Sequence, residues 1–144
     1  MKKNIIGFTL LAFLASNSFA FSQKVKMQDI QANYTQVTIL DKGTKRIILI
    51  PKDDNQTNKM TAYSAKQLES KEGVIVSFKN TSQLSISEFE TKYGLKFKKK
   101  LMIGYYIFKN VSESSDTQII ANIIKNETNV KTVKPNWKLK NQPR

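Results

Sequence analysis

The spacing of hydrophobic and polar residues changes several times after residue 73, and each change predicts a new element. Residues 74–78 are mostly β-branched and place alternate side chains on one hydrophobic face, which predicts a short strand. The motif SISE at residues 85–88 is a capping box, and the hydrophobic residues after it recur at helical spacing. Gly94 provides a C-terminal stop, so the pattern predicts a helix that ends there.

The pattern continues with a hairpin, a second helix and a last strand. Residues 95–98 alternate as a half-buried strand does, and a glycine lies in the connection to a second strand at residues 105–108. Residues 117–125 carry four isoleucines in a stripe as wide as one buried helix face. Residues 130–133 predict a short last strand, and Pro135 excludes its continuation as a central strand.

These elements predict an α+β fold of the ferredoxin-like type, β-α-β-β-α-β, with one antiparallel sheet and two helices on one face. Before it, two β-branched runs flank Gly43 and predict a β-hairpin, while residues 61–70 fit either a short helix or irregular chain. The predicted elements divide the chain into a signal peptide (1–20), a leader, β-hairpin and linker (21–72), the ferredoxin-like domain (73–137) and a C-terminal tail (138–144). Such a fold does not by itself define a function.

The strand at residues 105–108 differs from the others because both of its faces are apolar. Tyr105 and Ile107 point one way, while Tyr106 and Phe108 point the other. A strand with helices on one side and water on the other should alternate, so the second apolar face needs a cover. That cover is either the N-terminal hairpin or a partner protein.

The N-terminus has the features of a secretory signal peptide. Two lysines precede an apolar run at residues 5–14, and Ser18 and Ala20 suit the small subsites of signal peptidase. Cleavage between Ala20 and Phe21 is expected, which predicts a periplasmic or secreted bacterial protein. The alternative is a membrane anchor, but the apolar run is too short to span a bilayer, and no comparable segment follows once the signal is removed.

The composition argues against catalysis. The chain contains no cysteine and no histidine, which excludes disulfides, thiolate or ordinary zinc sites, and Cys-His or Ser-His-Asp nucleophile systems. Its close acidic pairs are Asp53 with Asp54, in a polar loop, and Glu88 with Glu90, which includes a helix cap. Neither resembles a tuned acid–base pair. We therefore expect no enzyme activity, no cofactor and no metal.

The chain is strongly basic. After loss of the signal, 22 basic and 11 acidic residues leave a net charge of +11. The densest cluster, at residues 96–100, largely alternates with hydrophobic residues, as on the solvated face of a strand, whereas single-strand nucleic-acid sites favour lysines among exposed aromatics or glycines. This pattern argues against nucleic acid. A basic periplasmic or surface module that binds anionic envelope polymers, lipid or nucleic acid remains the alternative function.

Four motifs carry a resemblance to a known family: VIVSFK at residues 74–79, KYGLK at 92–96, the isoleucine-rich second helix, and above all NVKTVKPN at 129–136. In order and spacing they resemble the prodomains (propeptide inhibitors) of subtilisin-like serine proteases. The likeness covers a little under half of the chain. Such a prodomain normally precedes a protease domain, and none follows within these 144 residues. We therefore expect a stand-alone prodomain whose subtilase partner is encoded by another gene.

The resemblance also implies a binding mode. In that family the sheet face without helices docks on the protease, and the segment after the last strand lies in the active-site cleft. Such prodomains inhibit the protease and act as folding chaperones for it. Carried over to this chain, the docking face holds Tyr106 and Phe108, or else Tyr105 and Ile107. The tail set is Pro135, Asn136, Trp137, Lys138, Leu139, Lys140, Asn141 and Gln142.

Within this tail, Asn136 occupies a position where the family often has an acidic residue that caps a protease helix, and Leu139 is a candidate for an apolar subsite. Lys134 and Pro135 depart from the family pattern, and residues 21–72 have no counterpart in a minimal prodomain. The alternative for Trp137 is a lid over the edge of the sheet. The alternative for the tail lysines is a solvated terminus.

Overall fold

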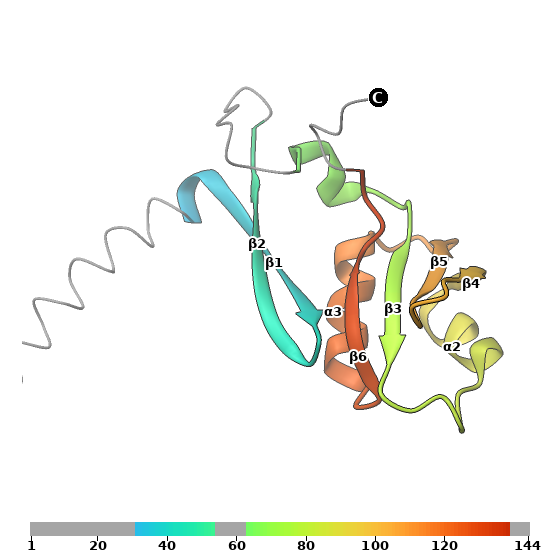
Figure 1. Ribbon diagram of the computed structural model, residues 1–144. Helices are drawn as coiled ribbons and strands as arrows, with labels where there is room; N and C mark the ends of the chain where they lie inside the picture. Colours follow the sequence, from blue (N-terminus) through green and yellow to red (C-terminus); the bar gives the residue numbers. More distant parts are fainter. Residues whose placement is uncertain (1–30, 54–62, 139–144) are drawn as a thin grey trace, which may run out of the picture. The chain divides into compact units, whose positions relative to one another are not determined.

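The computed structural model describes residues 31–53 and 63–138 (Figure 1). The fold is that of the unit that begins at Thr35, and Tyr34, just before it, is the first residue of β1. Its elements are β1 (Tyr34–Asp41), β2 (Thr44–Pro51), the 3-10 helix η1 (Ala65–Glu69), β3 (Val74–Phe78), α2 (Ile86–Tyr93), β4 (Leu95–Lys100), β5 (Tyr106–Asn110), α3 (Asp116–Asn126) and β6 (Val130–Pro135).

The strands form one six-stranded sheet in the order β2-β1-β6-β3-β5-β4. The pairings β1–β6, β6–β3, β3–β5 and β5–β4 are all antiparallel. The α+β class predicted from the sequence is therefore correct. No helix in the described part of the chain is long and apolar enough to cross a membrane.

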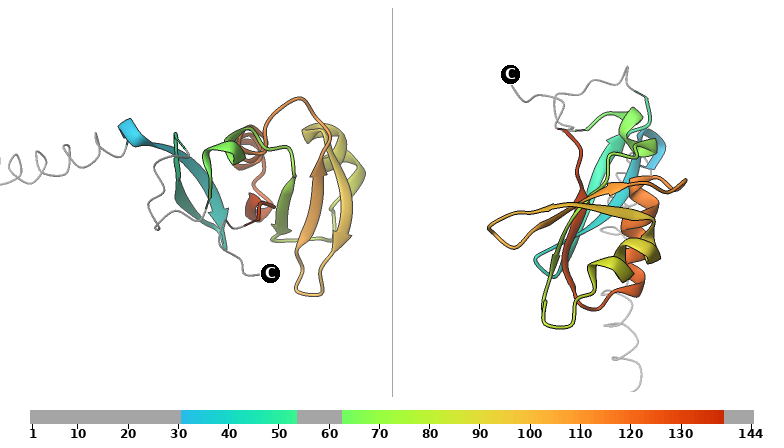
Figure 2. Two further views of the ribbon diagram at one scale, coloured as in Figure 1. Left: turned by 90° about the horizontal axis from the view of Figure 1, so that it is seen from above. Right: turned by 90° about the vertical axis from the view of Figure 1, so that its right-hand side faces the viewer.

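Helices α2 and α3 lie on the same side of the sheet (Figure 2, right). The main core is formed where their apolar faces meet the strands, and its fully buried members include Phe108, Val76 and Ile120. Both helices begin at serine caps: the Ser85 side chain accepts a hydrogen bond from Glu88 N, and Ser115 forms a capping box with Gln118. Burial of these amphipathic helices is the main source of stability for the fold.

The hairpin β1–β2 extends the sheet beside β6 and does not cover the face opposite the helices. Its two-residue turn places Lys42 and Gly43 at positive φ, 50° and 84°, as the type I′ hairpin turn requires. The turn is held by Gly43 N, which donates to Lys131 O at 2.7 Å, and by Lys42 N, which donates to Thr132 Oγ1 at 3.1 Å. The predicted hairpin is thus confirmed, but its position removes it as the cover for the second face of β5.

A second, smaller core lies between the hairpin, η1 and the end of β6. Its buried members are Val37, Ile50 and Trp137, with Tyr63 and Leu68 packed against them. The rings of Tyr63 and Trp137 meet edge to face with centroids 5.5 Å apart. Residues 65–69, which the sequence left between helix and irregular chain, form a single 3-10 turn of this core.

One prediction about β6 is wrong. The predicted last strand ends at residue 133, because Pro135 was expected to stop it. In the structure β6 continues to Pro135 and lies between two other strands. The proline is tolerated because β1 pairs with β6 at Leu40 and Val133, before Pro135 is reached. Pro135 itself is opposite Val74 of β3, on the other side of β6. The missing N–H of Pro135 therefore does not interrupt a ladder on the β1 side.

Candidate protein-binding surface

The two faces of β5 have different environments. Tyr106 and Phe108 point toward the helices, are 6% and 0% exposed, and belong to the main core. Tyr105 and Ile107 are half-buried and lie on the opposite face, which no described helix covers. Of the two pairs that the sequence offered for docking, the geometry therefore leaves Tyr105 and Ile107.

A row of four residues crosses this open face perpendicular to the strands. Ile75 of β3 is opposite Ile107 of β5, and these two isoleucines form its centre. Lys134 of β6 is opposite Ile75, and Lys99 of β4 is opposite Ile107. The open face thus has an apolar centre with a lysine at each end, which is the arrangement expected of a surface that binds an apolar patch with an acidic margin.

Further lysines surround the same centre. Lys98 and Lys109 line a shallow hollow over Ile75 and Ile107, and the Lys134 ammonium lies 5.8 Å from the centre of the Tyr105 ring. A cation over an aromatic face is held by the ring quadrupole, so this contact keeps Lys134 close to the face. The basic residues of the open face therefore come from three strands, β4, β5 and β6.

The root of the tail is held by a buried carboxylate that the sequence analysis did not identify. Asp116, the first residue of α3, is fully buried. Its Oδ2 accepts from the Trp137 indole at 2.8 Å, its Oδ1 accepts from Asn110 Nδ2 at 2.9 Å, and Gly73 N lies 3.1 Å from both oxygens. This junction, which we call the Asp116 clamp, ties the start of β3, the end of β5, α3 and the tail together.

The remaining tail residues follow from this clamp. Pro135 is buried at the end of β6, and the half-buried Asn136 donates its backbone N–H to Gly73 O at 2.9 Å. Lys138 is exposed, and its carbonyl accepts from the Gln67 side chain at 2.8 Å. Trp137 is buried in the second core, so the segment available to enter a cleft begins no earlier than Lys138.

The predicted tail residues Leu139, Lys140, Asn141 and Gln142, and the cleavage-site residues Ala20 and Phe21, lie outside the described residues.

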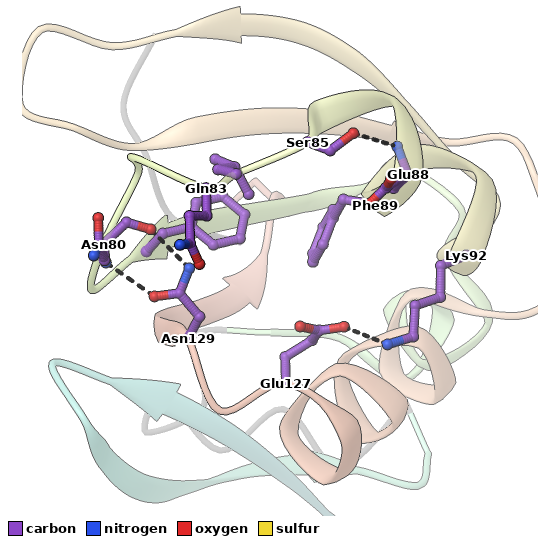
Figure 3. A pocket seen from close by; sticks show the side chains of 10 residues that line it. Asn80, Gln83, Ser85, Glu88, Phe89, Lys92, Glu127 and Asn129 are labelled. Atoms are coloured by element: carbon purple, nitrogen blue, oxygen red, sulfur yellow. Dashed lines mark hydrogen bonds and ion pairs between the residues drawn. The ribbon is translucent and has the colours of Figure 1, made fainter.

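A separate pocket of about 440 Å³ opens between α2, the end of α3 and the loop after β3 (Figure 3). Its polar rim is paired internally: Asn80 N donates to Asn129 Oδ1 at 2.9 Å, and Asn129 Nδ2 donates to Asn80 O at 2.7 Å. Across the pocket, Lys92 and Glu127 form an ion pair at 2.6 Å. The first pair joins the loops after β3 and before β6, and the ion pair joins α2 to the end of α3, so we assign the pocket a structural role.

Glu127 also accepts from the Tyr93 hydroxyl at 2.7 Å, and the three groups shift one another's pKa. Burial and the hydrogen bond to Glu127 raise the pKa of Tyr93 to about 12. The hydrogen bond to Glu127 raises the pKa of Lys92. Burial alone would raise the pKa of Glu127, but the hydrogen bonds from Lys92 and Tyr93 outweigh it, so the pKa of Glu127 lies below its ordinary value.

These shifts predict how Glu127 contributes to stability as the pH changes. Because its pKa is lower in the folded state, the ionised carboxylate stabilises the fold above the ordinary value of 4.5, and this contribution is lost as the pH falls through the folded-state pKa. Urea unfolding should show that Glu127→Gln is less stable than the parent at neutral pH. The difference should shrink in acid. A difference that grows in acid would contradict the assignment.

Metal binding has no support in the same part of the chain. Among residues 31–53 and 63–138, no group of three or more acidic, histidine or cysteine side chains gathers closely enough to hold a metal ion.

The chain matches no family model, no curated protein and no solved structure.

Proposed function

We propose that this chain is an exported, stand-alone prodomain-like protein that binds a subtilisin-like serine protease in trans, as an inhibitor, a folding chaperone or both. The open face carries the proposal: an apolar centre ringed by lysines is left without a helix or hairpin to cover it. The mechanism is occlusion. The chain performs no chemistry and needs no cofactor.

A ferredoxin-like assignment for residues 73–137 is part of this proposal. It is supported by the order β6-β3-β5-β4, by the position of α2 between β3 and β4 in the sequence, and by the position of α3 between β5 and β6. Both helices on one side leave the other side available to a partner, as the resemblance implies.

The proposed contact has two parts with different roles. The open face would supply affinity, because Ile75 and Ile107 are side chains that a partner can desolvate. The chain from Lys138 onward would occupy the cleft, and the Asp116 clamp would hold the start of that segment in place. Together a sheet face and an extended tail are sufficient for the ~1,600 Å² of a typical protease–inhibitor contact.

The test is to mix the purified chain with subtilisin-like proteases from the same organism at several ratios. We expect inhibition of peptide hydrolysis, faster recovery of the denatured protease, or both, together with a complex on size-exclusion chromatography. Ile107→Glu should weaken inhibition by about 30-fold or more, because it places a charge at the apolar centre. Ile47→Glu, on an exposed position of β2, is the matched control and should inhibit normally.

Salt dependence separates this proposal from the alternative of a module for anionic polymers. The lysines around the open face favour that alternative, and binding of that kind should collapse as ionic strength rises. Docking through the isoleucine centre should persist. The proposal fails if the chain gives no inhibition, no refolding assistance and no complex with any of the proteases.

A further inference from the structure

The turn between β4 and β5 carries the most exposed hydrophobic side chains of the described residues. Met102 is fully exposed, and Ile103 is 76% exposed. The turn is nevertheless ordered, because Leu101 N donates to Tyr105 O at 2.7 Å and Gly104 N donates to Leu101 O at 3.0 Å. Figure 2 (right) shows this hairpin projecting beyond the other strands. The fold therefore holds two apolar side chains outward at a rigid tip.

The charged residues behind the tip are all basic. Lys98, Lys99 and Lys100 precede it on β4, and all three are exposed. Between residues 95 and 111 the chain has five lysines and no acidic residue. Lys100 is further positioned by the Tyr106 ring, whose centre lies 5.2 Å from its ammonium. An apolar apex is thus backed by a band of positive charge.

We propose that this tip inserts into the surface of a bilayer that contains anionic phospholipid. Along a strand, Lys100 and Lys98 lie about 7 and 13 Å behind Met102, from a rise of about 3.3 Å per residue. Interfacial protein segments bury their apolar side chains about 5–10 Å deep, at the boundary of head groups and acyl chains. When Met102 and Ile103 reach that depth, the lysines lie among the phosphates.

The shape of the tip favours a bilayer over a protein as its occupant. Specific protein interfaces bury more than about 1,000 Å² and need complementary pockets for protruding side chains. A turn with two apolar side chains offers much less area. A bilayer requires no such pocket and supplies the negative charge that complements the lysines. The inference does not depend on protease binding.

The experiment measures partitioning onto vesicles of phosphatidylglycerol and phosphatidylcholine, with pure phosphatidylcholine as reference. The chain is expressed from its own Met1, the mass of the recovered protein is recorded, and all variants share that N-terminus. Flotation should show binding that depends on phosphatidylglycerol. Met102→Ser with Ile103→Ser should lower the partition coefficient by about tenfold or more, through loss of apolar burial. Lys98→Gln with Lys99→Gln should lower it by a similar factor at low salt.

Matched controls come from the same chain. Ile47→Ser with Val111→Ser removes two exposed apolar side chains away from the tip, and Lys66→Gln with Lys125→Gln removes two exposed charges from the helices. The apolar control should partition like the parent. The charge control should lose less affinity than the Lys98 and Lys99 variant, because its charges do not adjoin the tip.

A depth measurement makes the test specific for the tip. The chain has no cysteine, so an environment-sensitive fluorophore can be attached at a single introduced residue, Met102→Cys, or at the exposed helix position Asn122→Cys as control. On anionic vesicles only the label at residue 102 should shift to the blue. The proposal is overturned if the vesicles do not bind the chain, if the tip variants bind like the parent, or if the label at residue 102 stays in water.

Discussion

Replacement of Asp116 by alanine is expected to lower the free energy of unfolding by about 3–5 kcal/mol. The substitution leaves Gly73 N and Trp137 Nε1 without their acceptor inside the protein, while Asn110 Nδ2 keeps only its hydrogen bond to Ser114 O. Each buried donor without a partner costs about 1–3 kcal/mol, and removal of one side of a buried charged network costs about 3–5 kcal/mol. Because a domain of this size is stable by about 5–15 kcal/mol, the variant should be close to unfolding at room temperature.

Urea denaturation followed by far-ultraviolet circular dichroism measures this effect. Trp137→Phe is the informative companion, since it keeps a ring in the second core and removes a single donor, so its loss should be about 1–2 kcal/mol. Glu69→Ala, at an exposed position of η1, should stay within about 0.5 kcal/mol of the parent. A loss below about 1 kcal/mol for Asp116→Ala would mean that the clamp does not hold the fold together.

Gly73→Ala is the second substitution with a large expected effect. Gly73 has φ +118°, a region that residues with a side chain rarely adopt, and an added Cβ would lie 2.0 Å from Phe108 O. The nearest atoms, Phe108 O and Lys109 Cα at 2.9 Å, both belong to the backbone, so neither a side-chain rotation nor a small shift relieves the clash. We expect a loss of about 3 kcal/mol or more, from backbone strain together with displacement of β3 from β5.

Gly104→Ala separates the two causes. Gly104 also has positive φ, +81°, but no atom lies within 4 Å of an added Cβ. This control should therefore show strain alone, about 1–2 kcal/mol. If Gly73→Ala were no more destabilising than Gly104→Ala, the close approach of Gly73 to Phe108 O would not exist in solution.

The elements predicted correctly from the sequence are those whose signals are local. Ser85 and Gly94 mark the ends of α2, and Gly43 marks the turn of the first hairpin, because a cap or a turn depends on residues only a few positions apart. The second helix was placed one residue late. Its cap, Ser115, belongs to a run of serines that also fits a turn.

The Asp116 clamp could not be predicted in the same way. Its partners lie at positions 73, 110 and 137, and nothing near Asp116 in the sequence indicates that these segments meet. The usable signal was weak: an acidic residue just after a serine cap favours the first turn of a helix, which explains its position but not its burial. For the same reason the sequence does not decide whether Trp137 belongs to a binding tail or forms a lid over the edge of the sheet.

The exposed tip shows a different limit. Leu101, Met102 and Ile103 form an apolar run that a pattern of alternating residues does not distinguish from the end of a buried strand. Their exposure follows from the turn that Gly104 closes, which directs two of the three side chains away from the sheet. Only the three-dimensional arrangement shows that the tip and the open face beside it are two different surfaces.

The position of β6 has a consequence for the kinetics of folding. It is the last strand along the chain, yet it lies between β1 and β3, so the hairpin has no strand to join until residues 130–135 are in place. Its partner residues are separated by tens of positions, as in Leu40 with Val133, and such non-local pairing slows folding. Until β6 docks, one edge of β1 and one edge of β3 therefore remain unpaired.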